Sequence, residues 1–96
     1  MSIQQLHLVQ CSYQRINACL QELTQITQEN DLICLFADAT LAIYEPQLQN
    51  FAKVLVLDSD AKLMNIKDIS LNNIESITYT DLADYIVQAD KVFTWR

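Results

Sequence analysis

Thiol groups are the side chains of this sequence best suited to chemistry at a defined point. The 96 residues include three cysteines, Cys11, Cys19 and Cys34, and a single histidine, His7. The cysteines form no CxxC pair and, with one histidine, they lack the spacing of a zinc site, so we expect no bound metal. An odd number of cysteines without a recognisable secretory leader favours free thiols in a cytoplasmic protein.

The three thiols differ in their expected surroundings. A thiol attacks as its thiolate, which a helix N-terminus stabilises, so the favoured position is the loop after the carboxyl end of a strand. Cys11 lies in such a loop, after a strand predicted at residues 3–9. Cys19 falls on the apolar stripe of the next predicted helix, where a thiol is usually a buried hydrophobe. Cys34 lies in the middle of an apolar run, and we interpret it as a core residue.

The other polar candidates have plainer interpretations. His7 lies within the first predicted strand, where a lone histidine is more often packed than catalytic. Asp38 and Asp58 each follow an apolar strand; they could form a carboxylate pair, but strand-exit caps that face water are the favoured interpretation. The chain contains no glycine, which excludes glycine-rich nucleotide-binding loops, and we expect no cofactor.

Composition limits the possible partners. The chain has 12 acidic and 6 basic residues, a formal charge of −6, and its basic residues are scattered, so direct binding to nucleic acid is not expected. No apolar run approaches the roughly 20 residues that span a bilayer, so we expect no membrane segment. Residues 1–96 have room for a single domain, and their 51% hydrophobic content suggests that some apolar surface faces another chain.

The apolar run from Leu32 to Ala37, bounded by two aspartates, organises the predicted fold. Such a run is typical of a strand covered on both faces, and it needs helices above and below it. Further strands are predicted at residues 3–9, 53–58, 74–78 and 91–95. Their alternation with helices predicts an α/β fold with three α/β/α layers and a mostly parallel five-stranded sheet.

Two amphipathic helices are predicted between these strands. The first has Ser12 as its N-cap, ends near residues 28–31 and buries a stripe of five residues. These are Ile16, Cys19, Leu20, Leu23 and Ile26. The second is capped by Thr80 or Asp81 and buries Leu82, Ala83, Ile86 and Ala89. Between them, we expect one or two helical turns at residues 38–43, a turn ended or begun by Pro46, a short helix at 61–64 and a surface connection at 65–73.

Five local strings resemble the TusB/DsrH family of sulfur-relay subunits. They are Leu6-His7-Leu8-Val9 followed by Ser12, the strand ending in Asp38, Val56-Leu57 with Asp60, Thr78-Tyr79-Thr80-Asp81-Leu82, and the terminal Val92-Phe93-Thr94-Trp95. Two departures stand out. Ala39 replaces the glycine that follows the aspartate in most members, which puts a positive-φ turn there in doubt, and Met64-Asn65-Ile66 replaces an "ARGL" segment.

The resemblance implies a DsrEFH-like fold and a function in sulfur relay. Members move persulfide sulfur between proteins as heterohexamers that contain two copies of three homologous subunits. This chain would be the small subunit beside TusC/DsrF-like and TusD/DsrE-like partners, and through them it would meet sulfur donors and acceptors. The favoured destination is 2-thiouridine at the tRNA wobble position. A DsrH-type role in dissimilatory sulfur oxidation and a stand-alone homo-oligomeric regulatory module are the alternatives.

The resemblance places the main acceptor cysteine on the TusD/DsrE-like subunit, which makes this chain an accessory subunit and leaves open whether it is itself an enzyme. Cys19, in "ACLQ", is similar to the cysteine that DsrH-type members carry in "SCLK", whereas many TusB-type members have none. Cys19 and Cys11 are therefore the two candidates for a persulfide carrier, and both could instead be structural. The candidate interface residues are Tyr44, Tyr79, Tyr85 and Trp95, with core packing as the alternative.

Overall fold

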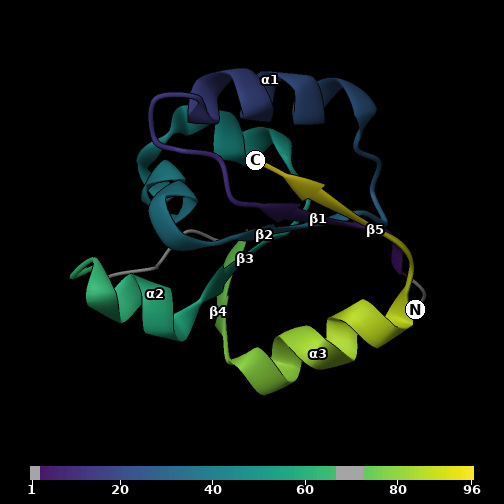
Figure 1. Ribbon diagram of the computed structural model, residues 1–96. Coiled ribbons are helices and arrows are strands. Elements are labelled where there is room, and N and C mark those ends of the chain that lie inside the picture. The colour runs from purple at the N-terminus through teal and green to yellow at the C-terminus, as the bar shows by residue number, and fades with distance from the viewer. Residues whose placement is uncertain (1–2, 67–72) are drawn as a thin grey trace.

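Parallel strands form the centre of the molecule (Figure 1). The computed structural model describes residues 3–66 and 73–96, and these contain five strands. The strands are β1 (Ile3–Val9), β2 (Leu32–Leu35), β3 (Val54–Leu57), β4 (Ile74–Ile77) and β5 (Ala89–Trp95). Their order is β4-β3-β2-β1-β5, and every neighbouring pair is parallel. The predicted α/β fold with a five-stranded parallel sheet is confirmed.

The strand order explains why helices lie on both faces. The chain steps from β1 to β4 in one direction and then passes back beyond β1 to reach β5. Because crossovers between parallel strands are almost always right-handed, reversing the direction moves the connecting helix to the opposite face. Accordingly α1 (Ile16–Ile26) and α3 (Tyr79–Gln88) cover opposite sides of the sheet (Figure 1). The two 3₁₀ segments η1 (Ala37–Tyr44) and η2 (Pro46–Asn50) contribute to the α1 side.

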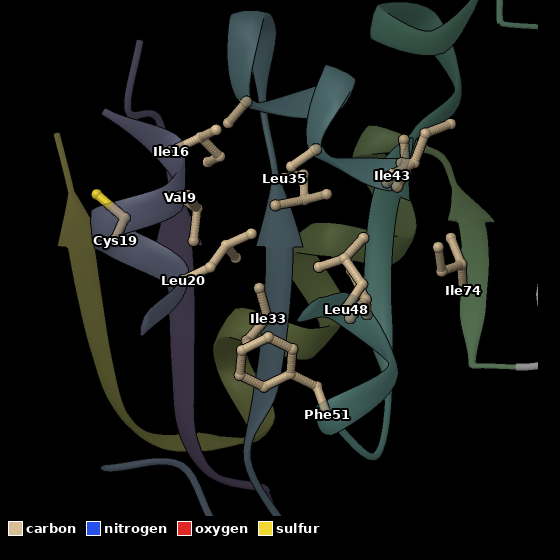
Figure 2. Packing of buried hydrophobic residues seen from close by; sticks show 14 of the residues in the cluster. Val9, Ile16, Cys19, Leu20, Ile33, Leu35, Ile43, Leu48, Phe51 and Ile74 are labelled. Atoms are coloured by element: carbon tan, nitrogen blue, oxygen red, sulfur yellow. The ribbon is translucent and has the colours of Figure 1, made fainter. Parts of the chain in front are cut away.

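The two sides of the sheet carry cores of unequal size. On the α1 side, Ile16 and Leu20 pack with Val9, Leu35 and other residues of a large cluster (Figure 2). The α3 side has a smaller cluster, in which Leu82 is the buried residue of the helix. Strands β2 and β3 are buried at every position because both clusters cover them. Burying one such aliphatic side chain contributes about 1.5–3 kcal/mol, so the α1 side supplies most of the hydrophobic stabilisation.

The N-terminus of α1 differs from the prediction. Ser12 is not the N-cap: its carbonyl accepts the N–H of Arg15 in a turn, and Arg15 occupies the cap position without a side-chain hydrogen bond. The helix therefore begins at Ile16 and is a turn shorter than predicted. Four of the five predicted stripe residues are buried, but Ile26 is exposed because it is the last helical residue, beyond the edge of the cluster.

The N-terminus of α3 also corrects a prediction. Thr78 is the N-cap, not Thr80 or Asp81. Its hydroxyl accepts the Asp81 N–H at 3.2 Å, and the Asp81 carboxylate accepts the Thr78 N–H at 3.1 Å. This reciprocal pair satisfies two donors that a helix start leaves unpaired, which explains why the helix begins before Thr80.

The face of α3 that meets the sheet is narrower than predicted. Leu82 is buried and Tyr85 and Ala89 are half-buried, whereas Ala83 and Ile86 are exposed. These three contacts follow a spacing of three and four residues, so the helix is turned about its axis relative to the predicted stripe. On this face the residues of β1 to β4 in the smaller cluster are buried, whereas Val92 of β5 is 41% exposed.

The segment after β2 contains a strained residue. The 3₁₀ segment η1 starts at Ala37, which has φ +48°, a conformation that costs a residue with a Cβ about 1–2 kcal/mol. The turn that a glycine would favour therefore lies at Ala37 and not at Ala39, which is buried. The Ala37 N–H donates to Asp60 Oδ2 at 3.0 Å, which holds this turn against the helix that follows β3, residues Asp58–Leu63.

The remaining connections are close to prediction. Pro46 begins η2, one of the two roles predicted for it. Helix α2 (Asp58–Leu63) starts directly after β3, three residues earlier than predicted, with two aspartates in its first turn. Acidic side chains at a helix N-terminus interact favourably with the helix dipole, which accounts for the early start. Most of the connection predicted at residues 65–73 lies outside the described residues.

Candidate functional site

Cys11 and Cys19 are brought together by the fold. Their sulfur atoms form a disulfide between Cα atoms 7.2 Å apart, so the prediction of three free thiols is wrong. Sequence spacing could not reveal this pair, because the distance between the two residues depends on how α1 lies across the sheet. Cys34 is a free, buried cysteine of β2, and burial, together with the nearby Asp60, raises the pKa of its thiol to about 12. Cys34 is therefore a core residue, as predicted.

The pair lies at the carboxyl edge of the sheet, where ligands bind in folds of this kind. Cys11 follows the end of β1, as predicted, and the preceding Gln10 N–H donates to the Trp95 carbonyl at 2.7 Å. Strands β1 and β5 are neighbours, but the loop after β1 leads to α1 and β5 arrives from α3 on the other face. The pair thus occupies the point where the direction of the chain across the sheet reverses.

Helix α1 fixes the position of Cys19. Its neighbours on the helix, Ile16, Leu20 and Leu23, are at most 1% exposed, so the helix cannot rotate without losing core contacts. Figure 2 shows Cys19 at the margin of this cluster, next to Ile16 and Leu20. Both residues are buried: Cys11 is fully buried and Cys19 is 7% exposed.

His7 and Trp95 form a buried polar pair near this site. The Trp95 Nε1–H donates to His7 Nδ1 at 3.0 Å, and the imidazole stacks on Phe93 with ring centroids 5.5 Å apart. Since the indole nitrogen can only donate, a neutral His7 carries its proton on Nε2. Burial lowers the pKa of His7, and Asp31 opposes this effect. His7 is a packed side chain, in agreement with its interpretation from sequence.

The carboxylates after β2 and β3 do not form the pair that was considered for them. Asp58 binds Lys62 at 3.1 Å and accepts a hydrogen bond from Ser76 Oγ at 3.5 Å, while Asp38 is exposed on η1. The sequence reasoning gave no structural role to Asp60, the α2 residue whose carboxylate accepts the Ala37 N–H at the start of η1. In residues 3–66 and 73–96, no group of His, Cys, Asp and Glu side chains is arranged to hold a metal ion.

Several large apolar side chains are exposed on β5 and α3. Strand β5 pairs only with β1 among the described strands, so its other edge presents open backbone N–H and C=O groups. Val92 and Phe93 on β5 are each 41% exposed, and on α3 Ile86 is 39% and Val87 83% exposed. We call Ile86, Val87 and Val92 the β5–α3 surface; Phe93 lies on the other face of the same edge strand, beside His7.

Comparison with known proteins identifies the family. Residues 12–92 match the family model described as DsrH like protein. The chain belongs to the DsrH-like family. The crystal structure of the YchN protein from E. coli aligns with this DsrH-like chain at a TM-score of 0.71, with 17% identity over 99% of this chain and 100% of that one, which shows a shared fold. No curated protein matches the sequence.

Membership in the DsrH-like family places the chain among the subunits of sulfur-relay systems. Cys19 lies inside the matched segment and Cys11 immediately before it. Among the residues that the structure describes, no helix of the DsrH-like chain is long and apolar enough to cross a membrane.

The residues predicted for an interface of the DsrH-like chain fall into two groups. Tyr44 and Tyr79 are exposed, at 70% and 62%, whereas Tyr85 and Trp95 are half-buried and pack against the two cores. Sequence reasoning missed the β5–α3 surface because Ile86 was assigned to the buried face of the helix and no exposure was predicted for Val92. One signal was available: Val92 and Phe93 are adjacent and point to opposite faces, so both can be buried only if helices cover both faces of this strand.

Proposed function

We propose that this DsrH-like protein is the small subunit of a heterohexameric, cytoplasmic sulfurtransferase complex. It would pass persulfide sulfur toward 2-thiouridine synthesis at the tRNA wobble position, beside TusC/DsrF-like and TusD/DsrE-like sister subunits. In this proposal residues 1–96 form one domain, and the chain does not itself bind the tRNA, in keeping with its charge of −6.

The observation that carries the proposal is the β5–α3 surface. An edge strand with open hydrogen-bonding groups and exposed apolar side chains is a liability unless another chain covers it. Phe93 also stacks on the buried His7, so its ring is already fixed on this edge and would lose little conformational freedom on binding. Tyr79, at the start of α3, is an exposed aromatic residue that would extend the contact. Tyr44, on η1, is exposed on the α1 side and would belong to a separate contact.

Co-purification with the sister subunits tests the subunit role. The chain is co-expressed with a tagged TusD/DsrE-like and an untagged TusC/DsrF-like subunit, and the mass of the assembly is measured by light scattering. We expect Val87→Asp to abolish assembly, because Val87 is 83% exposed on α3 and a charge there would be buried on binding. The matched control is Leu63→Asp, at an 85% exposed residue of α2 outside the surface, which should assemble normally.

The outcomes separate the candidate roles. A stable monomer that binds neither sister subunit would refute the subunit role. A homo-oligomer that binds neither of them would favour a stand-alone regulatory module. Deleting the chain in its source organism should remove wobble 2-thiouridine, measured by mass spectrometry of tRNA nucleosides. Normal 2-thiouridine with impaired sulfur oxidation would instead assign the chain to the dissimilatory branch.

A second candidate function, a persulfide carrier in its own right, is favoured by the Cys11–Cys19 pair. Its sulfur atoms lie at the carboxyl edge of the sheet, where an acceptor thiol would meet a partner protein. Cys19 would be the acceptor because it is the less completely buried residue of the two and is the fourth residue of α1, near the helix N-terminus whose dipole stabilises a thiolate. Incorporation of one sulfur atom at Cys19 from the persulfidated sister subunit, detected by peptide mass spectrometry, is the test.

A further inference from the structure

We propose that Cys11 is the resolving thiol for a persulfide carried on Cys19, so that the pair releases the sulfur as hydrosulfide and closes to a disulfide. This inference rests on the proposed function, because it requires that sulfane sulfur reach this chain. The substrate class is a protein persulfide or a low-molecular-weight persulfide. The products are hydrosulfide and the Cys11–Cys19 disulfide found in the structure.

The geometry decides which sulfur of the persulfide Cys11 can attack. In a relay step an acceptor thiolate attacks the outer sulfur and carries it away. Cys11 Sγ is instead bonded to Cys19 Sγ, the atom that would be the inner sulfur of a persulfide. An attack along this contact forms the Sγ–Sγ bond and breaks the bond to the outer sulfur. The fold therefore favours discharge of the sulfur over its transfer from Cys19 to Cys11.

The step balances without an external oxidant. The Cys11 thiolate supplies the electron pair for the new bond, and the outer sulfur leaves as HS⁻ with the electron pair of the broken bond. The sulfane sulfur is reduced to sulfide while the two cysteine sulfurs are oxidised to a disulfide. A cellular dithiol reductant then returns the pair to thiols for the next cycle.

Two features argue against a purely structural role for the disulfide. First, the elements that it joins are already held by the core, since Val9 of β1 and Ile16, Leu20 and Leu23 of α1 are fully or almost fully buried. Second, the proposed function places the chain in the cytoplasm, a reducing compartment. Disulfides there are usually transient and catalytic or redox-sensing. Because the backbones are fixed by packing, the two thiols stay adjacent after reduction, as a reversible couple requires.

The segment between the cysteines provides a route to the buried pair. Residues 12–15 are all exposed, and they make short turn hydrogen bonds from Arg15 N–H to Ser12 O at 3.0 Å and from Ile16 N–H to Tyr13 O at 3.5 Å. The Arg15 carbonyl also accepts the Cys19 N–H at 3.1 Å, the first turn of α1. Segments with few buried contacts open most readily. A donor that displaces this turn would reach Cys19 more readily than Cys11, because Cys19 is 7% exposed and Cys11 is fully buried.

Sulfide release and intact mass test the inference. The full chain, with its sister subunits, is reduced with a dithiol, freed of reductant and treated with one equivalent of glutathione persulfide. We expect the wild-type chain to become two hydrogen atoms lighter and to release one equivalent of sulfide. The Cys11→Ser chain should become one sulfur atom heavier, at Cys19, and should release sulfide only at the rate of the small persulfide alone. Cys34→Ala, outside the pair, should behave as wild type.

A second variant guards against misfolding of the first, and two outcomes would overturn the resolving role. Cys11→Ala suits the buried, apolar position and should repeat the result of Cys11→Ser if the serine variant loses its helical circular dichroism. A wild-type chain that retains the added sulfur would overturn the resolving role while leaving the chain a persulfide carrier. Absence of sulfur uptake in every variant would also overturn the resolving role. The subunit role is tested independently by the co-purification experiment.

Discussion

Replacing Trp95 by Phe is the most informative single test of how the edge of the sheet is held. The substitution keeps an aromatic ring but removes the Nε1–H that donates to His7 Nδ1 at 3.0 Å. His7 is 1% exposed, so water cannot replace the lost donor. A buried acceptor left without a partner costs about 1–3 kcal/mol. For a domain of this size, whose total stability is about 5–15 kcal/mol, the loss is large and lowers Tm by roughly 4–8 °C per kcal/mol.

The assay is urea denaturation followed by far-UV circular dichroism, since Trp95 is the only tryptophan and its fluorescence is lost in the variant. Tyr44→Phe is the control: it removes a polar aromatic group from a residue that is 70% exposed and should change the free energy of unfolding by less than about 0.5 kcal/mol. In a His7→Phe background the acceptor is absent, so Trp95→Phe should cost much less there than in wild type. Equal costs in the two backgrounds would refute the buried hydrogen bond.

Three further predictions concern caps, strain and pH. Thr78→Ala should destabilise the protein by about 0.5–2 kcal/mol in chemical denaturation, whereas Thr80→Ala should be neutral or slightly stabilising, because Thr78 and not Thr80 forms the reciprocal cap with Asp81. Ala37→Gly should raise the denaturation midpoint by the equivalent of up to about 1 kcal/mol, since glycine adopts a φ of +48° without strain, and a lower midpoint would contradict that backbone assignment. The pKa of His7 is held below its ordinary value of 6.5, so the unfolded chain binds a proton more readily than the folded one and stability should fall as the pH drops below 6.5. This loss should shrink in His7→Phe, and an unchanged pH profile in that variant would assign it to other groups.

The sequence predicted the elements of the fold better than their ends. The four residues of β2 and the four of β3 are buried as predicted, because a short continuous apolar run has few other stable arrangements in water. The caps at Ser12 and Thr80 were wrong for different reasons. Near α3, Thr78, Thr80 and Asp81 compete and the backbone decides among them, whereas near α1 Ser12 is the only such residue and the helix begins a turn after it. The capping role of Thr78 could have been recognised from Asp81 three residues later.

The candidate site was predicted residue by residue but not as an arrangement. Cys11 was expected after the first strand and Cys19 on the buried stripe of the following helix, and both positions are correct. That the two thiols meet was not foreseen, because Cys11 was expected to be free in a loop. The pairing depends on the angle at which α1 crosses the sheet, and no local pattern reports that angle.

The sequence alone determined the secondary-structure elements of this protein and its family. Apolar runs indicated the strands, spacings of three and four residues indicated the helices, and five local strings resembled a sulfur-relay family. These signals act over a few residues, where burial and backbone geometry leave few choices. The tertiary structure alone decided that β5 returns beside β1 and becomes an open edge, and that Trp95 reaches His7 across 88 residues. It also decided that Cys11 faces Cys19. These contacts join residues that are far apart in the sequence. They depend on the order of the strands and the handedness of the crossovers, which are fixed only when the sheet assembles.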